Sequence, residues 1–160
     1  MIEGDVMPRA RIKRKPTRKS SDRILLTFQV FISHSSQDSW IAGQMGKEIE
    51  ALGAKIWLDK HAIKGGDEVS KKITQGIRGS SELVVLLSPE SQKSQWVSDE
   101  VGWALGQRKH VTPILHYIRP EDMMQQLRDR KAIPLNDFDS FLIELKQRIK
   151  LKERIDRKRR

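Results

Sequence analysis

The chain contains no cysteine among its 160 residues, which excludes disulfide bonds, thiolate nucleophiles and cysteine-based zinc sites. A chain without disulfides fits a reducing compartment, so we expect a cytoplasmic location. No apolar run approaches the roughly 20 residues of a membrane-spanning helix. The N-terminus also lacks the uninterrupted apolar stretch of a secretory signal. The sequence therefore predicts a protein without a membrane span.

Several motifs of well-known enzyme classes are also missing. The GxxxxGK[ST] spacing of a P-loop and the GxGxxG fingerprint of a dinucleotide-binding dehydrogenase do not occur. A G-x-S-x-G turn, which would support a Ser-His-Asp hydrolase, is absent as well. The four histidines, His34, His61, His110 and His116, do not have the spacing of metal ligands. We therefore expect neither a metal site nor a bound cofactor.

Positive charge is concentrated at the two ends of the chain. The formal net charge is +10, a value that suggests a nucleic-acid or anionic-surface binder. Residues 1–23 carry a net +5 and residues 146–160 a net +7, which leaves −2 for residues 24–145. We predict a basic disordered tail over 1–23, a domain over 24–150, and a basic helix end or tail over 151–160.

The charged ends have two interpretations. They can capture nucleic acid, anionic lipid or an acidic partner by electrostatic attraction. They can equally be solvated arms that only keep the protein soluble, because runs of like charge are common and unspecific. The sequence alone leaves both interpretations open.

Between the ends, short apolar runs alternate with longer amphipathic stretches. The short runs are typical of strands and lie at 24–33, 55–58, 83–87, 111–115 and 132–135. The longer stretches have helical periodicity and lie at 38–52, 67–77, 94–107 and 123–129, with a last one from Phe138 onward. Alternating strands and helices predict an α/β fold, in which a mainly parallel sheet has helices on both faces.

In open parallel sheets, sites form beyond the carboxyl ends of the strands. These ends are expected at 33–37, 59–67, 88–91 and from His116 onward. The polar loop Ser33–Asp38 can bind an anion such as phosphate at the N-terminus of the following helix. It can also be a simple serine turn that caps this helix.

The helix predicted over 94–107 carries an unusual polar residue. Trp96, Glu100 and Trp103 are spaced to lie on one helical stripe, so the carboxylate is expected between two indoles. Burial beside aromatic rings disfavours the charged carboxylate, and an indole can stack on a planar cationic ring. This arrangement suits a substrate with a cationic aromatic leaving group. Alternatively, both tryptophans are packing residues and Glu100 is solvated.

Four segments, in this order, resemble a Toll/interleukin-1 receptor (TIR) domain of bacterial type. The first is Val30-Phe31-Ile32-Ser33-His34-Ser35-Ser36-Gln37-Asp38, and the others lie at 56–67, 73–89 and 94–115. The resemblance covers roughly residues 28–148. It implies a flavodoxin-like fold with a five-stranded parallel sheet.

The resemblance also implies an activity. Many TIR domains are NAD+ glycohydrolases, which release nicotinamide and give ADP-ribose or a cyclic ADP-ribose isomer. Their catalytic glutamate lies in a W-x-x-x-E segment, here Trp96 to Glu100, so the resemblance favours Glu100 as the catalytic residue. NAD+ is then the substrate rather than a cofactor. The expected substrate-binding residues are Trp96, Ser33, His34, Ser35, Asp59, Gly65, Gly66, Asp67 and Ser91.

The family further implies partners. TIR–TIR self-association is expected, and a separate sensor or effector protein would supply a trigger. A stand-alone bacterial TIR chain fits immune signalling against phage. The alternative is a TIR domain that only assembles, as a non-catalytic signalling scaffold or adaptor.

Overall fold

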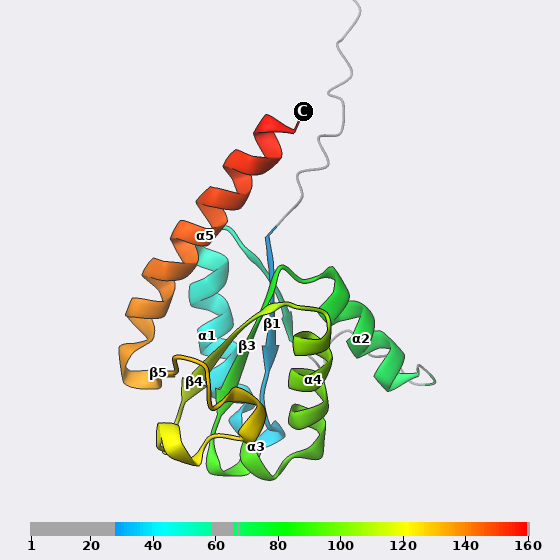
Figure 1. The fold of residues 1–160 in the computed structure, drawn as a ribbon, viewed down its shortest axis with the longest axis vertical. Helices are drawn as coiled ribbons and strands as arrows, with labels where there is room; N and C mark the ends of the chain where they lie inside the picture. Colours follow the sequence, from blue (N-terminus) through cyan, green and yellow to red (C-terminus); the bar gives the residue numbers. More distant parts are fainter. Residues whose placement is uncertain (1–27, 59–65, 67, 160) are drawn as a thin grey trace, which may run out of the picture.

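The computed structural model describes residues 28–58, 66 and 68–159. Within them, one sheet contains the strands β1 Gln29–Ser33, β2 Lys55–Leu58, β3 Glu82–Leu87, β4 His110–Leu115 and β5 Ile133–Pro134. Neighbouring strands are parallel, in the order β2-β1-β3-β4-β5 (Figure 1). All six residues of β3 are buried, as expected for a central strand of a sheet that is covered on both faces.

Helices cover both faces of this sheet. They are α1 Ser39–Ala51, α2 Val69–Gly79, the short α3 Pro89–Lys93, α4 Gln95–Gly106 and α5 Phe138–Lys158. Apolar residues of α1 and α5 pack in one core with Val30 and Ile32 of β1. Those of α2 and α4 pack in a second core with Phe31. The alternation along β1 thus divides the interior into two layers, which confirms the α/β fold predicted from the sequence.

The strand order creates a switch point beside β1. From β1 the chain passes through α1 to β2 on one side, and then through α2 to β3 on the other side (Figure 1). In an open α/β sheet, the crevice at the carboxyl ends of the two strands flanking this reversal is the usual place for a ligand. Here the carboxyl ends of these two strands are Ser33 of β1 and Leu87 of β3.

The local predictions hold for most elements, with two corrections. The helix predicted over 123–129 is wrong, because Met123 and Met124 are extended and only a 3₁₀ turn over Gln125–Leu127 forms. The side chains of Met123 and Leu127 are both buried, so apolar residues at helical spacing reach the core here without an α-helix. The short helix α3 was not predicted, although Pro89 at its first position and the capping serines around it are a typical start.

Some predictions fall on residues that the structure does not describe. The tail over 1–23 and the start of the first strand, residues 24–27, lie outside the described residues. At the other end of the chain, α5 continues as one helix to Lys158. Among the described residues, no helix has the length and apolar character needed to cross a membrane. The same residues contain no cluster of three or more histidine or acidic side chains fit to hold a metal ion.

Candidate active site

A buried carboxylate lies at the switch point. Glu100 projects from the second turn of α4, and its side chain is completely buried. Its Oε2 accepts a hydrogen bond from the hydroxyl of Ser33, the last residue of β1. The structure therefore rejects the interpretation of Glu100 as a solvated helix residue and brings two of the predicted site residues into contact.

A second buried carboxylate organises the loop beside it. Asp38 follows β1 in a 3₁₀ turn over Ser36–Asp38, and its Oδ2 accepts two hydrogen bonds. One comes from the hydroxyl of Ser35 and one from that of Ser88, each at 2.6 Å. Because Ser88 directly follows β3, this pair of bonds ties the ends of β1 and β3 together across the switch point.

The other predicted serine, Ser91, has a structural role in the same region. The hydroxyl of Ser88 accepts a hydrogen bond from the Ser91 backbone N–H, and the Ser91 hydroxyl accepts one from the Ser88 backbone N–H at 2.7 Å. This reciprocal capping box begins α3. Ser91 is fully buried, so its hydroxyl already serves the cap.

The two tryptophans of α4 are arranged differently from the expectation. The rings of Trp96 and Trp103 meet edge to face, with their centroids 6.1 Å apart. That contact leaves no room for a carboxylate between the indoles, and Glu100 extends instead to Ser33 on β1. The sequence spacing placed the three residues on one side of the helix, but it did not predict that the two indoles would contact each other.

Of the remaining predicted site residues, the structure describes only His34 and Gly66. His34 is buried, with its Nδ1 3.4 Å from the carbonyl oxygen of Ile32. Gly66 is exposed and has a φ of +88°, a conformation that favours glycine; it borders a hollow of about 320 Å³ at the start of α2. The predictions for Asp59, Gly65 and Asp67 lie outside the described residues.

The individual roles of Asp38 and Ser88 were not evident from the sequence. The available signal was the position of both residues at predicted strand ends. Their pairing depends on β1 and β3 being neighbours in the sheet, which local sequence does not specify. Together, Ser33, Ser35, Asp38, Ser88 and Glu100 form a buried polar cluster, which we call the switch-point cluster.

Comparison with known proteins assigns the family. A family model described as "TIR domain" matches residues 30–148. The chain belongs to the TIR domain family. One relative is "2' cyclic ADP-D-ribose synthase AbTIR" of Acinetobacter baumannii (strain 1295743), 30% identical over 114 residues, which cover 66% of this chain and 42% of that protein. Another is "NAD(+) hydrolase TcpA" of Theionarchaea archaeon (strain DG-70-1), 23% identical over 111 residues, covering 66% of this chain and 34% of that protein.

Solved TIR domains share the fold. The TIR domain of the Toll-related receptor TRR-2 from Hydra magnipapillata matches with a TM-score of 0.66 at 20% identity, covering 78% of this chain and 99% of that one. This likeness confirms the flavodoxin-like TIR fold of the chain. The two curated TIR proteins are longer, and the matched region spans less than half of each of them.

Proposed function

We propose that this TIR domain cleaves the bond between nicotinamide and ribose in NAD+, with Glu100 as the catalytic residue. The observation that carries the proposal is the buried Glu100 carboxylate, which Ser33 holds at the switch point of the sheet. The names of the curated relatives, a cyclic ADP-ribose synthase and an NAD+ hydrolase, support the same chemistry. The W-x-x-x-E spacing from Trp96 to Glu100 provides further support.

The chemistry requires little more than one well-placed carboxylate. Nicotinamide is cationic in NAD+, so it leaves as a neutral molecule with the electron pair of the broken C1′–N bond and needs no general acid. Positive charge then develops on the ribose, as in glycoside cleavage. An ionised Glu100, already fixed by its neighbours, would stabilise that charge without reorganising.

The products depend on the nucleophile that replaces nicotinamide. Attack by water gives ADP-ribose and releases one proton, for which the Glu100 carboxylate is the acceptor in this proposal. Attack by a hydroxyl of the same molecule, without water, gives a cyclic ADP-ribose isomer and likewise releases one proton. Both products thus share one bond-breaking step at one carboxylate.

The other site residues have distinct proposed roles. Trp96, Ser33, His34 and Ser35 would line the substrate side, and Gly66, with Asp59, Gly65 and Asp67, would belong to the loop that borders it. Ser91 would act indirectly, because its hydroxyl caps α3. Since Glu100 is completely buried in the single chain, NAD+ can reach the carboxylate only after the site opens.

We further propose that the chain self-associates. Trp40 on α1 is 74% exposed, although tryptophan is highly buried on average in folded proteins. It borders a hollow of about 460 Å³ between α1 and the start of α5, lined also by Ile41, Met45, Leu135 and Phe138. This surface also suits the alternative function, a non-catalytic scaffold. A trigger from a separate sensor and a role in defence against phage rest on the family resemblance.

Product analysis tests the enzymatic proposal. The unmodified protein and Glu100→Ala, both concentrated, are each incubated with NAD+, and the products are separated and identified by mass spectrometry. We expect nicotinamide together with ADP-ribose or a cyclic ADP-ribose isomer from the unmodified protein only. Equal nicotinamide release by both would contradict a role for Glu100. Absence of release, together with assembly that tolerates Glu100→Ala and fails with Trp40→Ala, would favour the scaffold.

A further inference from the structure

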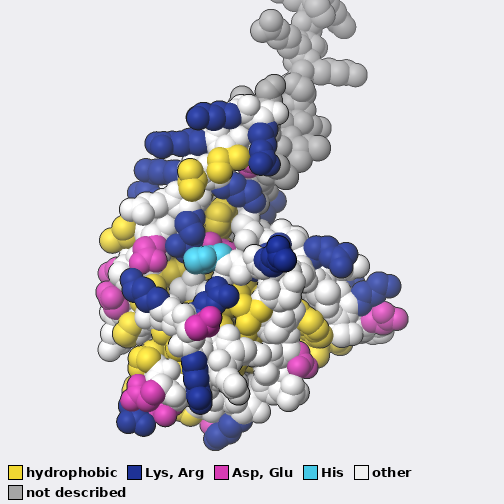
Figure 2. Space-filling view, viewed as in Figure 1, with side chains coloured by type: hydrophobic (Ala, Val, Ile, Leu, Met, Phe, Trp, Pro, Cys, Tyr) yellow, Lys and Arg dark blue, Asp and Glu magenta, His cyan; other side chains and the backbone are white. Residues whose placement is uncertain are grey.

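The solvent face of α5 is strongly basic. From residue 146 onward, the exposed side chains of this helix include Lys146, Lys150, Arg154, Arg157 and Lys158, which we call the α5 basic face. None of these five cations forms an ion pair with a carboxylate of the described residues. Figure 2 shows dark blue side chains standing out along this helix at the upper left. The positive charge assigned to this end from sequence is thus largely available to a partner.

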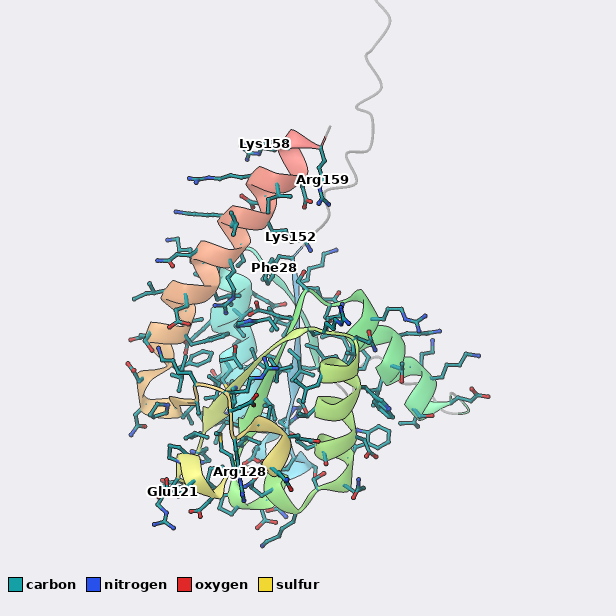
Figure 3. The ribbon with its side chains drawn as sticks, viewed as in Figure 1. Phe28, Glu121, Arg128, Lys152, Lys158 and Arg159 are labelled. Atoms are coloured by element: carbon teal, nitrogen blue, oxygen red, sulfur yellow. The ribbon has the colours of Figure 1, made fainter. Side chains whose placement is uncertain are left out.

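Two polar anchors fix the orientation of this face. On the opposite side of α5, Arg148 donates two hydrogen bonds to Glu82 at the start of β3, at 2.9 and 3.0 Å. One turn further along the helix, Lys152 donates to the hydroxyl of Ser81 at 2.8 Å and lies over the ring of Phe28 (Figure 3). The helix therefore cannot turn its cations toward the sheet, and Lys158 lies beyond the end of the sheet (Figure 3).

The cations are arranged in a row. Lys146, Lys150, Arg154 and Lys158 follow one another at intervals of four residues, which is about 6 Å of helix rise for each step. Arg157 adds a fifth charge beside the end of the row. A row of evenly spaced cations matches a linear polyanion with closely spaced phosphates, such as a nucleic-acid backbone.

The exposed apolar residues of α5 and its lack of exposed aromatic rings argue against a membrane surface and against single-stranded nucleic acid as the partner. The large exposed aliphatic residues of α5 are Ile143, Leu151 and Ile155, and Ile143 lies about 12 Å of helix rise from Leu151. They do not form the continuous apolar stripe that a helix needs to lie in a membrane surface. Both phenylalanines of α5 are buried, so this helix offers no aromatic ring that could stack on single-stranded bases.

We propose that the α5 basic face binds the phosphate backbone of double-stranded nucleic acid without reading its sequence. The proposal is independent of NAD+ cleavage, because the face contains no residue of the switch-point cluster. Contacts of this kind release counterions, so binding should weaken steeply with salt. Log K falls as log salt concentration rises, and each phosphate-contacting cation that is removed should make this fall less steep, by about one unit of slope.

A pair of charge-matched variants tests the proposal in the full chain. K146Q/K150Q/R154Q removes three cations of the face and keeps good helix formers. K47Q/K93Q/K131Q removes three exposed cations from α1, α3 and the segment before β5. Both variants have the same net charge and the same residues 1–23. Circular dichroism verifies that both fold.

Binding of a labelled 20-base-pair duplex is measured by anisotropy between 50 and 200 mM NaCl, beside vesicles of phosphatidylserine and phosphatidylcholine. We expect the first variant to lose about tenfold or more in duplex affinity near 100 mM NaCl, with a slope lower by about three. The second variant should stay within about threefold of the unmodified chain. Equal losses in both variants, no duplex binding, or binding to vesicles but not to duplex would each overturn the proposal.

Discussion

The hydroxyl of Ser33 donates a hydrogen bond to the carboxylate of Glu100, although the two residues are 67 positions apart in the chain. Ser33 ends the first strand and Glu100 lies in the second turn of α4, so the bond forms only because β1 and β3 are neighbours and α4 packs over them. A buried carboxylate with a fixed donor is a preorganised group. Its position at the switch point is the structural basis for the proposed chemistry.

Replacing Ser33 with alanine should affect both stability and catalysis. Ser33→Ala leaves the buried Glu100 carboxylate without this donor, which should cost about 1–3 kcal/mol in the free energy of unfolding. The carboxylate also loses its orientation, so nicotinamide release should fall by about tenfold or more. Urea unfolding and a nicotinamide assay measure the two effects. Ser39→Ala, at an exposed hydroxyl at the start of α1, is the control.

The effects of Ser33→Ala on stability and on nicotinamide release can be separated. A variant that is destabilised yet releases nicotinamide at the original rate, measured below its unfolding transition, would contradict the positioning role. It would leave Ser33 as a structural residue only.

Replacing Asp38 tests the bonds that join the ends of β1 and β3. In Asp38→Asn, the single amide oxygen is a weaker, neutral acceptor for the hydroxyls of Ser35 and Ser88. We expect the free energy of unfolding to fall by about 1.5–3 kcal/mol. The slope of this free energy against urea concentration should not change. Asp139→Asn, at an exposed carboxylate on α5, should change stability by less than about 0.5 kcal/mol. An Asp38→Asn protein as stable as the original would rule out the proposed role of these bonds.

Glu82 and Arg148 form a buried ion pair, and substituting Arg148 should cost more stability than substituting Glu82. The side chain of Glu82 is 2% exposed and that of Arg148 is 25% exposed. Arg148→Met therefore leaves a charge buried without its partner and should cost about 3–5 kcal/mol. Glu82→Gln should cost less, because the guanidinium can still reach water.

Combining both changes completes the test of this ion pair. The double variant E82Q/R148M should lose less stability than the sum of the single losses, because it buries no unpaired charge. Urea unfolding of the four proteins gives the coupling energy. Strictly additive losses would show that the pair does not anchor α5 to the sheet.

The fold was largely predictable because its signals are local. The aliphatic run Leu83 to Leu87 is typical of a central parallel strand, and the structure buries every residue of it. Helical periodicity likewise located α1 and α4. The segment 123–129 gave a wrong prediction because Met123 and Leu127 are both buried at helical spacing, although the backbone there forms a 3₁₀ turn and no α-helix.

The site was predictable only in part, because its contacts are between residues distant in sequence. The spacing on α4 and the family resemblance both pointed to Glu100. Neither indicated that Asp38 would accept hydrogen bonds from both Ser35 and Ser88, which are 53 positions apart. Neither indicated that Trp96 and Trp103 would contact each other. Strand order and side-chain direction decide these contacts, and local sequence does not contain them.

The most direct test of the account is the rate of nicotinamide release from NAD+ by Glu100→Gln. This substitution keeps the size of the side chain and an oxygen for Ser33 but removes the negative charge. Glu90→Gln, at a partly exposed carboxylate in the first turn of α3, is the matched control. With both proteins folded and equally concentrated, we predict that Glu100→Gln loses about 100-fold or more of the rate, and that Glu90→Gln stays within about twofold. Release by Glu100→Gln at the rate of the control would contradict the proposal that this carboxylate is catalytic.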